Sequence, residues 1–110
     1  MIPLRRSSKS SKYKAVKTII DGIKFDSKKE AQRYLELKTL QSLNYITGLQ
    51  LQVKYDLIVN KIKICKYIAD FKYFEKGSVI VEDCKGVLTP IYKLKKKLMK
   101  AIYNIDILET

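Results

Sequence analysis

Three ionisable residues lie in parts of the sequence that are typical of β-strands, at positions where apolar side chains are the rule. Asp70 follows an apolar run, and a period of two places its side chain on the face of Ile68, an otherwise apolar setting. Asp83 and Lys85 are two residues apart and share one face of the next strand, whereas Glu82 points to the other face. If these two strands pair through a short turn, the two aspartates lie side by side at one end of the sheet.

Two neighbouring carboxylates repel each other unless a proton or a cation separates them. Mg²⁺ is the simplest such cation, with Mn²⁺ as its substitute, because it binds one or two carboxylates and completes its shell with water and substrate phosphate. Such a site could hydrolyse a phosphodiester, with Lys85 orienting water or stabilising negative charge and Gly86 leaving room for a ligand. A buried Asp–Lys ion pair at a solvated strand end explains the same residues, so the pattern alone leaves both interpretations open.

Glu30 is a further candidate ligand, because a carboxylate in the first turn of a helix packed on the sheet could reach the same cation. The sequence from Ser27 to Glu30 also matches the S-x-x-E capping box, in which the serine and the glutamate cap the helix reciprocally. Capping fully accounts for a glutamate at this position, so a structural role and metal ligation both remain open.

Several polar and basic residues could contact nucleic acid. Gln52 is one of the polar residues of an alternating strand, and a half-exposed strand tolerates it without any function. The lysines after position 92 form a basic stripe on a helix, and residues 1–14 form a basic arm that we expect to be flexible. A solvated helix face and a solubilising tail are the simpler explanations. The candidate DNA-binding residues are Gln52, Lys93, Lys96, Lys97, Lys100, Arg5 and Arg6.

The composition limits what else the chain can do. Its 110 residues include 23 Lys and Arg against 11 Asp and Glu, a net charge of +12 that favours a polyanionic partner. The absence of histidine excludes His-ligated zinc, Ser-His-Asp catalysis and imidazole bases. Two cysteines are too few for a four-thiolate zinc site or a disulfide framework. No apolar run approaches the ~20 residues of a membrane span, and the N-terminus lacks the apolar region of a signal peptide, so we expect a cytoplasmic protein.

Hydrophobic periodicity and turn residues predict one domain over residues 15–110. Asp21 and Gly22 indicate a hairpin turn, and the period changes from 3.6 to 2 after Gly48. Short connections make the three strands that follow an antiparallel meander. The expected elements are a hairpin over 15–25, a helix over 28–43, strands over 49–57, 62–74 and 79–85, a helix from 90, and a last strand over 105–108.

The second helix has a clear start and two differing faces. Thr89 is the expected N-cap and Pro90 the first helical residue. Spacing predicts that an apolar stripe packs on the sheet while the lysines face outward. That stripe consists of Ile91, Leu94, Leu98 and Ile102.

The eight tyrosines and two cysteines are expected to be structural. Half-buried tyrosines with the hydroxyl in water account for this content, and stacking on unpaired bases is the alternative. Cys65 and Cys84 are expected to be small core residues.

The arrangement resembles the PD-(D/E)XK, or restriction-endonuclease-like, nucleases, whose minimal core is αβββαβ. The resemblance covers roughly residues 25–108, with Ala69 in place of the motif's proline and Asp83 in place of its commoner glutamate. More narrowly, the sequence looks like small phage-encoded proteins of that superfamily that are described as endonucleases or as similar to Holliday-junction resolvases. The segments that carry this likeness are 21–31, 67–71, 81–86 and 92–97.

The resemblance implies a Mg²⁺-dependent site that cuts DNA, made of Glu30, Asp70, Asp83 and Lys85. It also implies that Gln52 could reach the site or the scissile phosphate. It implies a phage protein in the bacterial cell that acts on branched, recombining or replicating DNA. A domain of this size carries one site, so symmetrical cutting of two strands predicts a homodimer. The alternative is a non-catalytic nucleic-acid-binding or host-factor-inhibiting protein on a nuclease fold, and the charge alone would also suit a ribosome-associated protein.

Overall fold

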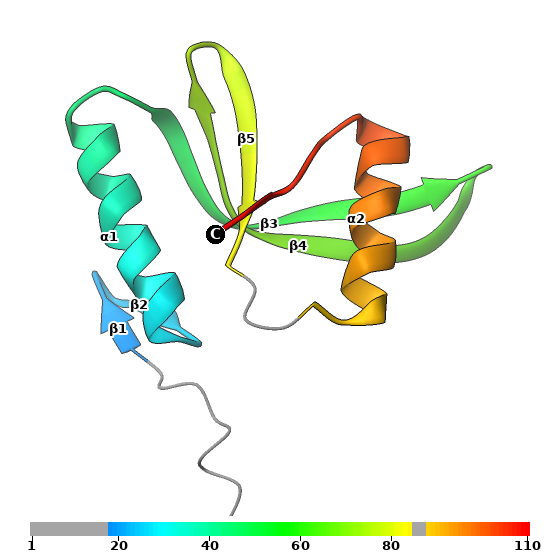
Figure 1. Cartoon of the computed structure of the whole chain (residues 1–110), viewed down its shortest axis with the longest axis horizontal. Helices are drawn as coiled ribbons and strands as arrows, with labels where there is room; N and C mark the ends of the chain where they lie inside the picture. The colour runs from blue at the N-terminus through cyan, green and yellow to red at the C-terminus, as the bar shows by residue number, and fades with distance from the viewer. Residues whose placement is uncertain (1–17, 85–87) are drawn as a thin grey trace, which may run out of the picture. The chain divides into compact units, whose positions relative to one another are not determined.

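The element order is hairpin, helix, three strands, helix and strand, an α+β architecture (Figure 1). The computed structural model describes residues 18–84 and 88–110. The chain forms two units, Met1–Leu35 and Glu36–Thr110, each of which we describe by itself. In the described residues, no helix is both long enough and apolar enough to cross a membrane. The elements are β1 (Thr18–Ile20), β2 (Ile23–Phe25), α1 (Lys28–Ser42), β3 (Thr47–Val59), β4 (Ile62–Glu75), β5 (Ser78–Asp83), α2 (Pro90–Tyr103) and β6 (Leu108–Glu109).

The first unit contains the predicted hairpin and the start of α1. β1 and β2 are antiparallel around the expected turn, where Asp21 and Gly22 both have positive φ. The Ser27 hydroxyl accepts a hydrogen bond from the Glu30 amide at 3.1 Å, as the capping box predicts. The Tyr34 hydroxyl donates to the Asp21 carboxylate at 2.8 Å, which ties the hairpin turn to the helix.

The second unit contains a four-stranded mixed sheet in the order β3-β4-β5-β6. The first three strands form the predicted antiparallel meander, and β6 pairs parallel to β5 after the chain passes through α2. Two-residue turns join the meander, and positive φ at Asn60, Lys61, Lys76 and Gly77 matches the type I′ geometry that suits twisted hairpins. β5 pairs with only the last part of β4, so the rest of β3 and β4 continues as a two-stranded ribbon (Figure 1).

One hydrophobic core lies between α2 and this ribbon. Its buried residues come from β3, β4, β5, α2 and the segment before β6, and are Leu57, Tyr67, Ala69, Val81, Tyr92, Met99 and Ile107. Leu98 and Ile102 pack against the core as predicted, but Ile91 and Leu94 are 66% and 54% exposed, so this half of the predicted stripe is wrong. The helix instead buries Tyr92 and Met99, whose side chains remove apolar surface from water against the core.

The end of α2 explains why the last strand is shorter than predicted. Asn104 adopts a left-handed conformation, and the amides of Asn104 and Ile105 bond back to the helix carbonyls of Lys100 and Met99. The helix therefore holds the start of the predicted 105–108 strand, and sheet pairing begins only at Leu108. The apolar alternation still has a structural meaning, because Ile107 is buried in the core.

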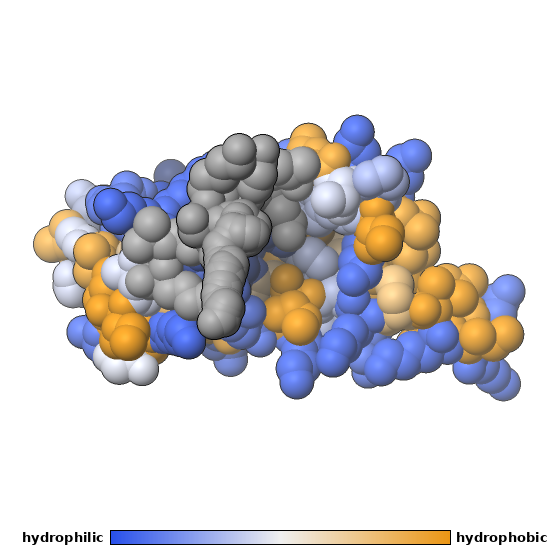
Figure 2. Space-filling view, turned by 90° about the horizontal axis from the view of Figure 1, so that it is seen from below, coloured by the Kyte–Doolittle hydropathy of each residue, from blue (hydrophilic) through white to orange (hydrophobic). Residues whose placement is uncertain are grey.

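The face of the ribbon that α2 does not cover is exposed and mixed in character. Ile58, Ile64 and Ile68 are all at least 38% exposed, and Lys54 and Lys66 lie between them. In Figure 2, hydrophobic and hydrophilic residues lie side by side toward the right-hand end of the view, where the hairpin end of the ribbon lies. The expectation that the face of Ile68 is a buried apolar setting is therefore wrong.

Candidate active site

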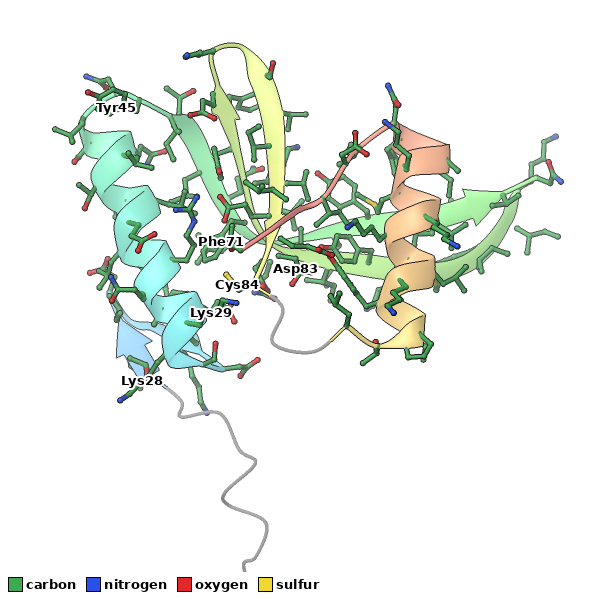
Figure 3. All side chains as sticks on the ribbon, in the orientation of Figure 1. Lys28, Lys29, Tyr45, Phe71, Asp83 and Cys84 are labelled. Atoms are coloured by element: carbon green, nitrogen blue, oxygen red, sulfur yellow. The ribbon has the colours of Figure 1, made fainter. Side chains whose placement is uncertain are left out.

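Asp70 and Asp83 lie at the same end of the β4–β5 pair. The last residues paired in this ladder are Phe71 and Glu82, and the two aspartates are the next residues beyond them on each strand. The amide of Cys84 donates a hydrogen bond to Oδ2 of Asp70 at 2.8 Å, so the Asp70 side chain reaches across to the end of β5. Figure 3 shows Asp83 and Cys84 at that end of β5. The strand register thus brings together the two carboxylates that the sequence singled out.

Gln52 extends this row onto a third strand. In the β3–β4 ladder, Leu51 pairs with Phe71 and Val53 with Ala69, which puts Gln52 opposite Asp70. Its Nε2 lies 3.4 Å from Oδ1 of Asp70, and its φ of 53° marks a local distortion of β3. A left-handed conformation at a non-glycine residue costs energy that the surrounding structure has to supply. Gln52 is therefore a neighbour of the carboxylate and not merely a polar residue on an exposed strand.

Asp83 is buried, with 1% of its surface exposed. The Tyr67 hydroxyl donates a hydrogen bond to Oδ2 of Asp83 at 2.5 Å, which offsets part of the cost of burying a carboxylate. Burial, above all, and then this hydrogen bond and the charge of Asp83 raise the pKa of the Tyr67 phenol. Tyr67 thus stays protonated and keeps donating to Asp83.

A second phenol, Tyr92 on α2, links the carboxylates to β6. Its hydroxyl donates to Oε2 of Glu109 at 2.8 Å, and Glu109 is the register partner of Asp83. Burial raises the pKa of the Tyr92 phenol, followed by this hydrogen bond and the negative charges of Glu109, Asp83 and Asp70. The hydrogen bonds that Glu109 accepts from Tyr92 and Lys96 lower its own pKa. Since Asp70 and Asp83 raise the pKa values of both Tyr67 and Tyr92, the two carboxylates act on the same small region.

Glu82 is a third buried carboxylate, which sequence reasoning placed on the opposite face without assigning it a partner. It is fully buried, accepts a hydrogen bond from the Tyr73 hydroxyl, and is contacted by the Thr110 hydroxyl at 3.3 Å.

The expectation that half-buried tyrosines keep their hydroxyls in water is wrong for Tyr67, Tyr73 and Tyr92, because each of these hydroxyls donates to a carboxylate. The available signal was weak: a buried phenol needs a polar partner, but the sequence does not say which one.

Other predicted site residues belong to the first unit or fall outside the described part of the chain. Glu30 belongs to the first unit, where its amide is capped by Ser27. Lys85 and the arm residues Arg5 and Arg6 lie outside the described residues.

The four predicted DNA-binding lysines of α2 divide into two pairs. Lys96 forms an ion pair with Glu109 at 3.1 Å, and Lys100 forms one with Asp106 at 2.9 Å. Lys93 and Lys97 make no such contact with any residue that the structure describes. The sequence analysis predicted the same DNA-binding role for all four of these lysines.

The described carboxylates offer a small ligand set for the Mg²⁺ that the sequence predicts. Across residues 18–84 and 88–110, no three or more His, Cys, Asp or Glu side chains are grouped so that they could hold a metal ion. Mg²⁺ needs only one or two carboxylates when water and phosphate complete its shell. Asp70 and Asp83 fit that smaller requirement, because both belong to one end of the sheet and both are oxygen donors.

Comparison with known proteins gave one match. A family model described as a protein of unknown function, DUF1064, matches residues 10–108. No curated protein and no solved structure matches the chain.

Proposed function

This chain belongs to the DUF1064 family, and because the function of that family is unknown we propose one from the residues themselves: a Mg²⁺-dependent endonuclease that hydrolyses DNA. The single observation that carries the proposal is the meeting of Asp70 and Asp83 at one end of the β4–β5 pair, beside Gln52. We further infer that the family is related to the PD-(D/E)XK nucleases. The αβββαβ order and these three positions support that relationship.

The two carboxylates are held differently, which suits a site that receives a cation. Asp83 is buried and fixed by Tyr67, whereas Asp70 is partly exposed and held by the Cys84 amide and by Gln52. A cation shared by the two would therefore enter from the side of Asp70. Mg²⁺ bound there would supply positive charge to polarise a phosphodiester and to favour hydroxide over water.

The protein's own groups would orient the ligands and the substrate. The Tyr67 hydroxyl occupies Oδ2 of Asp83 and so fixes the rotation of that carboxylate. Gln52 could exchange its long contact with Asp70 for a phosphate oxygen, since 3.4 Å is a weak hydrogen bond. Lys85, the remaining member of the D-x-K element, would stabilise the negative charge that develops on the phosphate.

The net charge of +12 and the lysines of α2 support DNA as the substrate, because phosphate contacts supply most of the affinity for nucleic acid. We propose branched DNA in a phage-infected bacterial cell as the biological setting, and a homodimer where two strands are cut. These follow from the likeness to resolvase-like phage proteins.

One observation favours the alternative of a non-catalytic DNA-binding protein. Asp83 is nearly fully buried and already bonded to Tyr67, so it could serve the fold without binding a cation. The two functions make opposite predictions for cleavage and the same prediction for binding.

The deciding experiment incubates the protein with linear, single-stranded, flap and four-way-junction DNA, with Mg²⁺, Mn²⁺ or EDTA. We expect cleavage of at least one substrate with either metal and none with EDTA. Asp70→Asn and Asp83→Asn should each lower the cleavage rate by roughly 100-fold or more, because a neutral amide is a poor ligand for Mg²⁺.

Asp56→Asn is the matched control, because Asp56 is an exposed carboxylate on β3 that pairs only with Lys63 among the contacts described for it. It should cut like the wild type. Binding of the same DNA is measured in EDTA. Binding without cleavage by the wild type would establish the non-catalytic alternative, and full cleavage by Asp83→Asn would show that the metal site is elsewhere.

A further inference from the structure

A cavity of about 450 Å³ lies between α2 and the segment that leads into β6. All four lysines of the helix stripe line it on one side. The chain beyond the helix contributes Ile105 and the two carboxylates of Asp106 and Glu109, and Leu88 closes the end near the start of the helix. Four lysines facing two carboxylates leave an excess of two positive charges.

Lys96 and Lys100 do not account for that excess. Their ammonium groups lie 3.1 Å from Glu109 and 2.9 Å from Asp106, and each pair joins the helix to the segment before or within β6. These two lysines therefore fasten the chain that forms the opposite wall.

Lys93 and Lys97 supply the uncompensated charge. They are four residues apart, so their side chains lie on the same face of α2, one turn from each other. Neither has an ion pair or hydrogen bond with a residue of the described part of the chain. Like charges at this spacing repel, and an anion between them would remove the repulsion.

The apolar part of the lining restricts the kind of anion. Leu88 is 48% exposed, and Ile105 adds a second apolar surface, so bare phosphate would leave these groups in water. A phosphate attached to a sugar and base would cover them.

We propose that this cavity binds a nucleotide, with Lys93 and Lys97 on its phosphate and with Leu88 and Ile105 against the sugar or base. The choice of a nucleotide over other organic phosphates rests on the proposed function. The position of the cavity also suits a nucleotide of a DNA strand. Glu109 lines the cavity and lies on β6, where it is the register partner of Asp83 on β5. A DNA strand with one nucleotide in the cavity would lead directly towards the carboxylates.

The test measures binding in EDTA, so that no cleavage enters the result. Thymidine 5′-monophosphate, the dinucleotide pTpT and inorganic phosphate are titrated into the full-length protein by calorimetry. We expect both nucleotides to bind more tightly than inorganic phosphate. The double variant Lys93→Ala/Lys97→Ala should weaken nucleotide binding at least about tenfold, because two charge-assisted contacts are lost.

The matched control is Lys54→Ala/Lys66→Ala, which removes the same charge from the uncovered face of the ribbon and should bind nucleotide like the wild type. Leu88→Ala should weaken nucleotide binding while leaving phosphate binding unchanged. Tighter binding of pTpT than of the mononucleotide would assign the site to a DNA strand. Equal binding of the two would assign it to a free nucleotide. Either result supports the site.

Three results would overturn the proposal. These are unchanged nucleotide binding in the Lys93/Lys97 variant with its unfolding transition intact, an equal loss in the control variant, and inorganic phosphate binding as tightly as the nucleotides. Because the measurement contains no metal, it stands whether or not the protein cuts DNA, and a failed cavity leaves the cleavage test of Asp70 and Asp83 untouched.

Discussion

Three phenols donate hydrogen bonds to three carboxylates around β5 and β6. Tyr67 bonds Asp83, Tyr73 bonds Glu82 and Tyr92 bonds Glu109. A carboxylate that loses water on folding keeps its charge only if polar groups replace the solvent, and a buried phenol is a neutral group that can do so. The first two pairs let a strongly basic protein keep Asp83 and Glu82 buried inside the second unit, whereas Glu109 is exposed.

Tyr67→Phe removes one of these donors while keeping the aromatic ring. We expect it to lower the free energy of unfolding by about 1.5–3 kcal/mol, because the lost hydrogen bond joins a buried carboxylate. If Asp83 binds Mg²⁺, the concentration of Mg²⁺ needed for half-maximal cleavage should also rise, by about tenfold or more. Urea denaturation and a Mg²⁺ titration measure the two effects.

Tyr103→Phe is the control for this change, because the Tyr103 hydroxyl donates to the exposed backbone carbonyl of Asp56. Tyr103→Phe should lower the free energy of unfolding by less than Tyr67→Phe does, and it should leave the Mg²⁺ concentration for half-maximal cleavage unchanged. If Tyr67→Phe changes stability without changing the Mg²⁺ dependence, Tyr67 has a purely structural role.

Sequence reasoning placed the two aspartates side by side because two strands joined by a short turn pair with each other, although it misjudged the face of Asp70 as apolar. It could not find Tyr67 as the partner of Asp83, because the bond joins residues 16 positions apart on different strands. The choice of partner depends on twist and register, which single residues do not reveal.

At the scale of elements, α2 contributes to both proposed sites. It covers the core and carries Tyr92, and it supplies the lysines that line the cavity. Its N-terminus is capped by the Thr89 hydroxyl, which accepts from the Tyr92 amide at 3.1 Å. The cap fixes the first turn and therefore the direction in which Tyr92 enters the core.

Thr89→Ala should lower the free energy of unfolding by about 1 kcal/mol, the usual value of an N-cap hydroxyl. Thr89→Ser keeps the hydroxyl and should remain within a few tenths of a kcal/mol of the wild type. Urea denaturation of the three proteins checks this. Equal stability of the alanine and serine variants would contradict a capping role.

The sequence predicted the elements well where local signals decide them. Asp21 with Gly22, Lys76 with Gly77, and Thr89 with Pro90 mark turns and a helix start through their own backbone preferences. The exposed side of α2 was misjudged because the apolar residues of this helix cover a wider arc than the core does, so that Ile91 and Leu94 stay exposed. Burial there is decided by what the sheet presents, which lies outside the helix sequence.

At the scale of the whole molecule, several tyrosines in the described part of the chain have raised pKa values, and for four of them burial is the largest cause. These four are Tyr34, Tyr55, Tyr67 and Tyr92. A phenol whose pKa is higher in the folded than in the unfolded protein holds its proton longer when folded. Its contribution to stability is complete below pH 10, the ordinary pKa, and is lost as the pH rises above it.

We therefore expect the free energy of unfolding to fall as the pH rises above 10, with the tyrosinate absorbance of the buried phenols appearing together with unfolding. Lysines also lose their charge in this range, so the comparison is with Tyr67→Phe/Tyr92→Phe, which retains every lysine. That variant should show a shallower decline. Parallel declines in the two proteins would mean that these phenols do not govern alkaline stability.

The parallel pairing of β6 with β5 also bears on the order in which the protein folds. Leu108 pairs with Glu82, 26 positions earlier in the chain, whereas the meander strands are joined by two-residue turns. Local contacts form before distant ones because their loops cost less entropy to close. The meander, which includes the phenol partners of Glu82 and Asp83, can thus assemble before β6 docks against their end of β5. We expect the acidic end of β5 to meet its hydrogen-bond donors first and to gain its last neighbouring strand only when the rest of the sheet is in place.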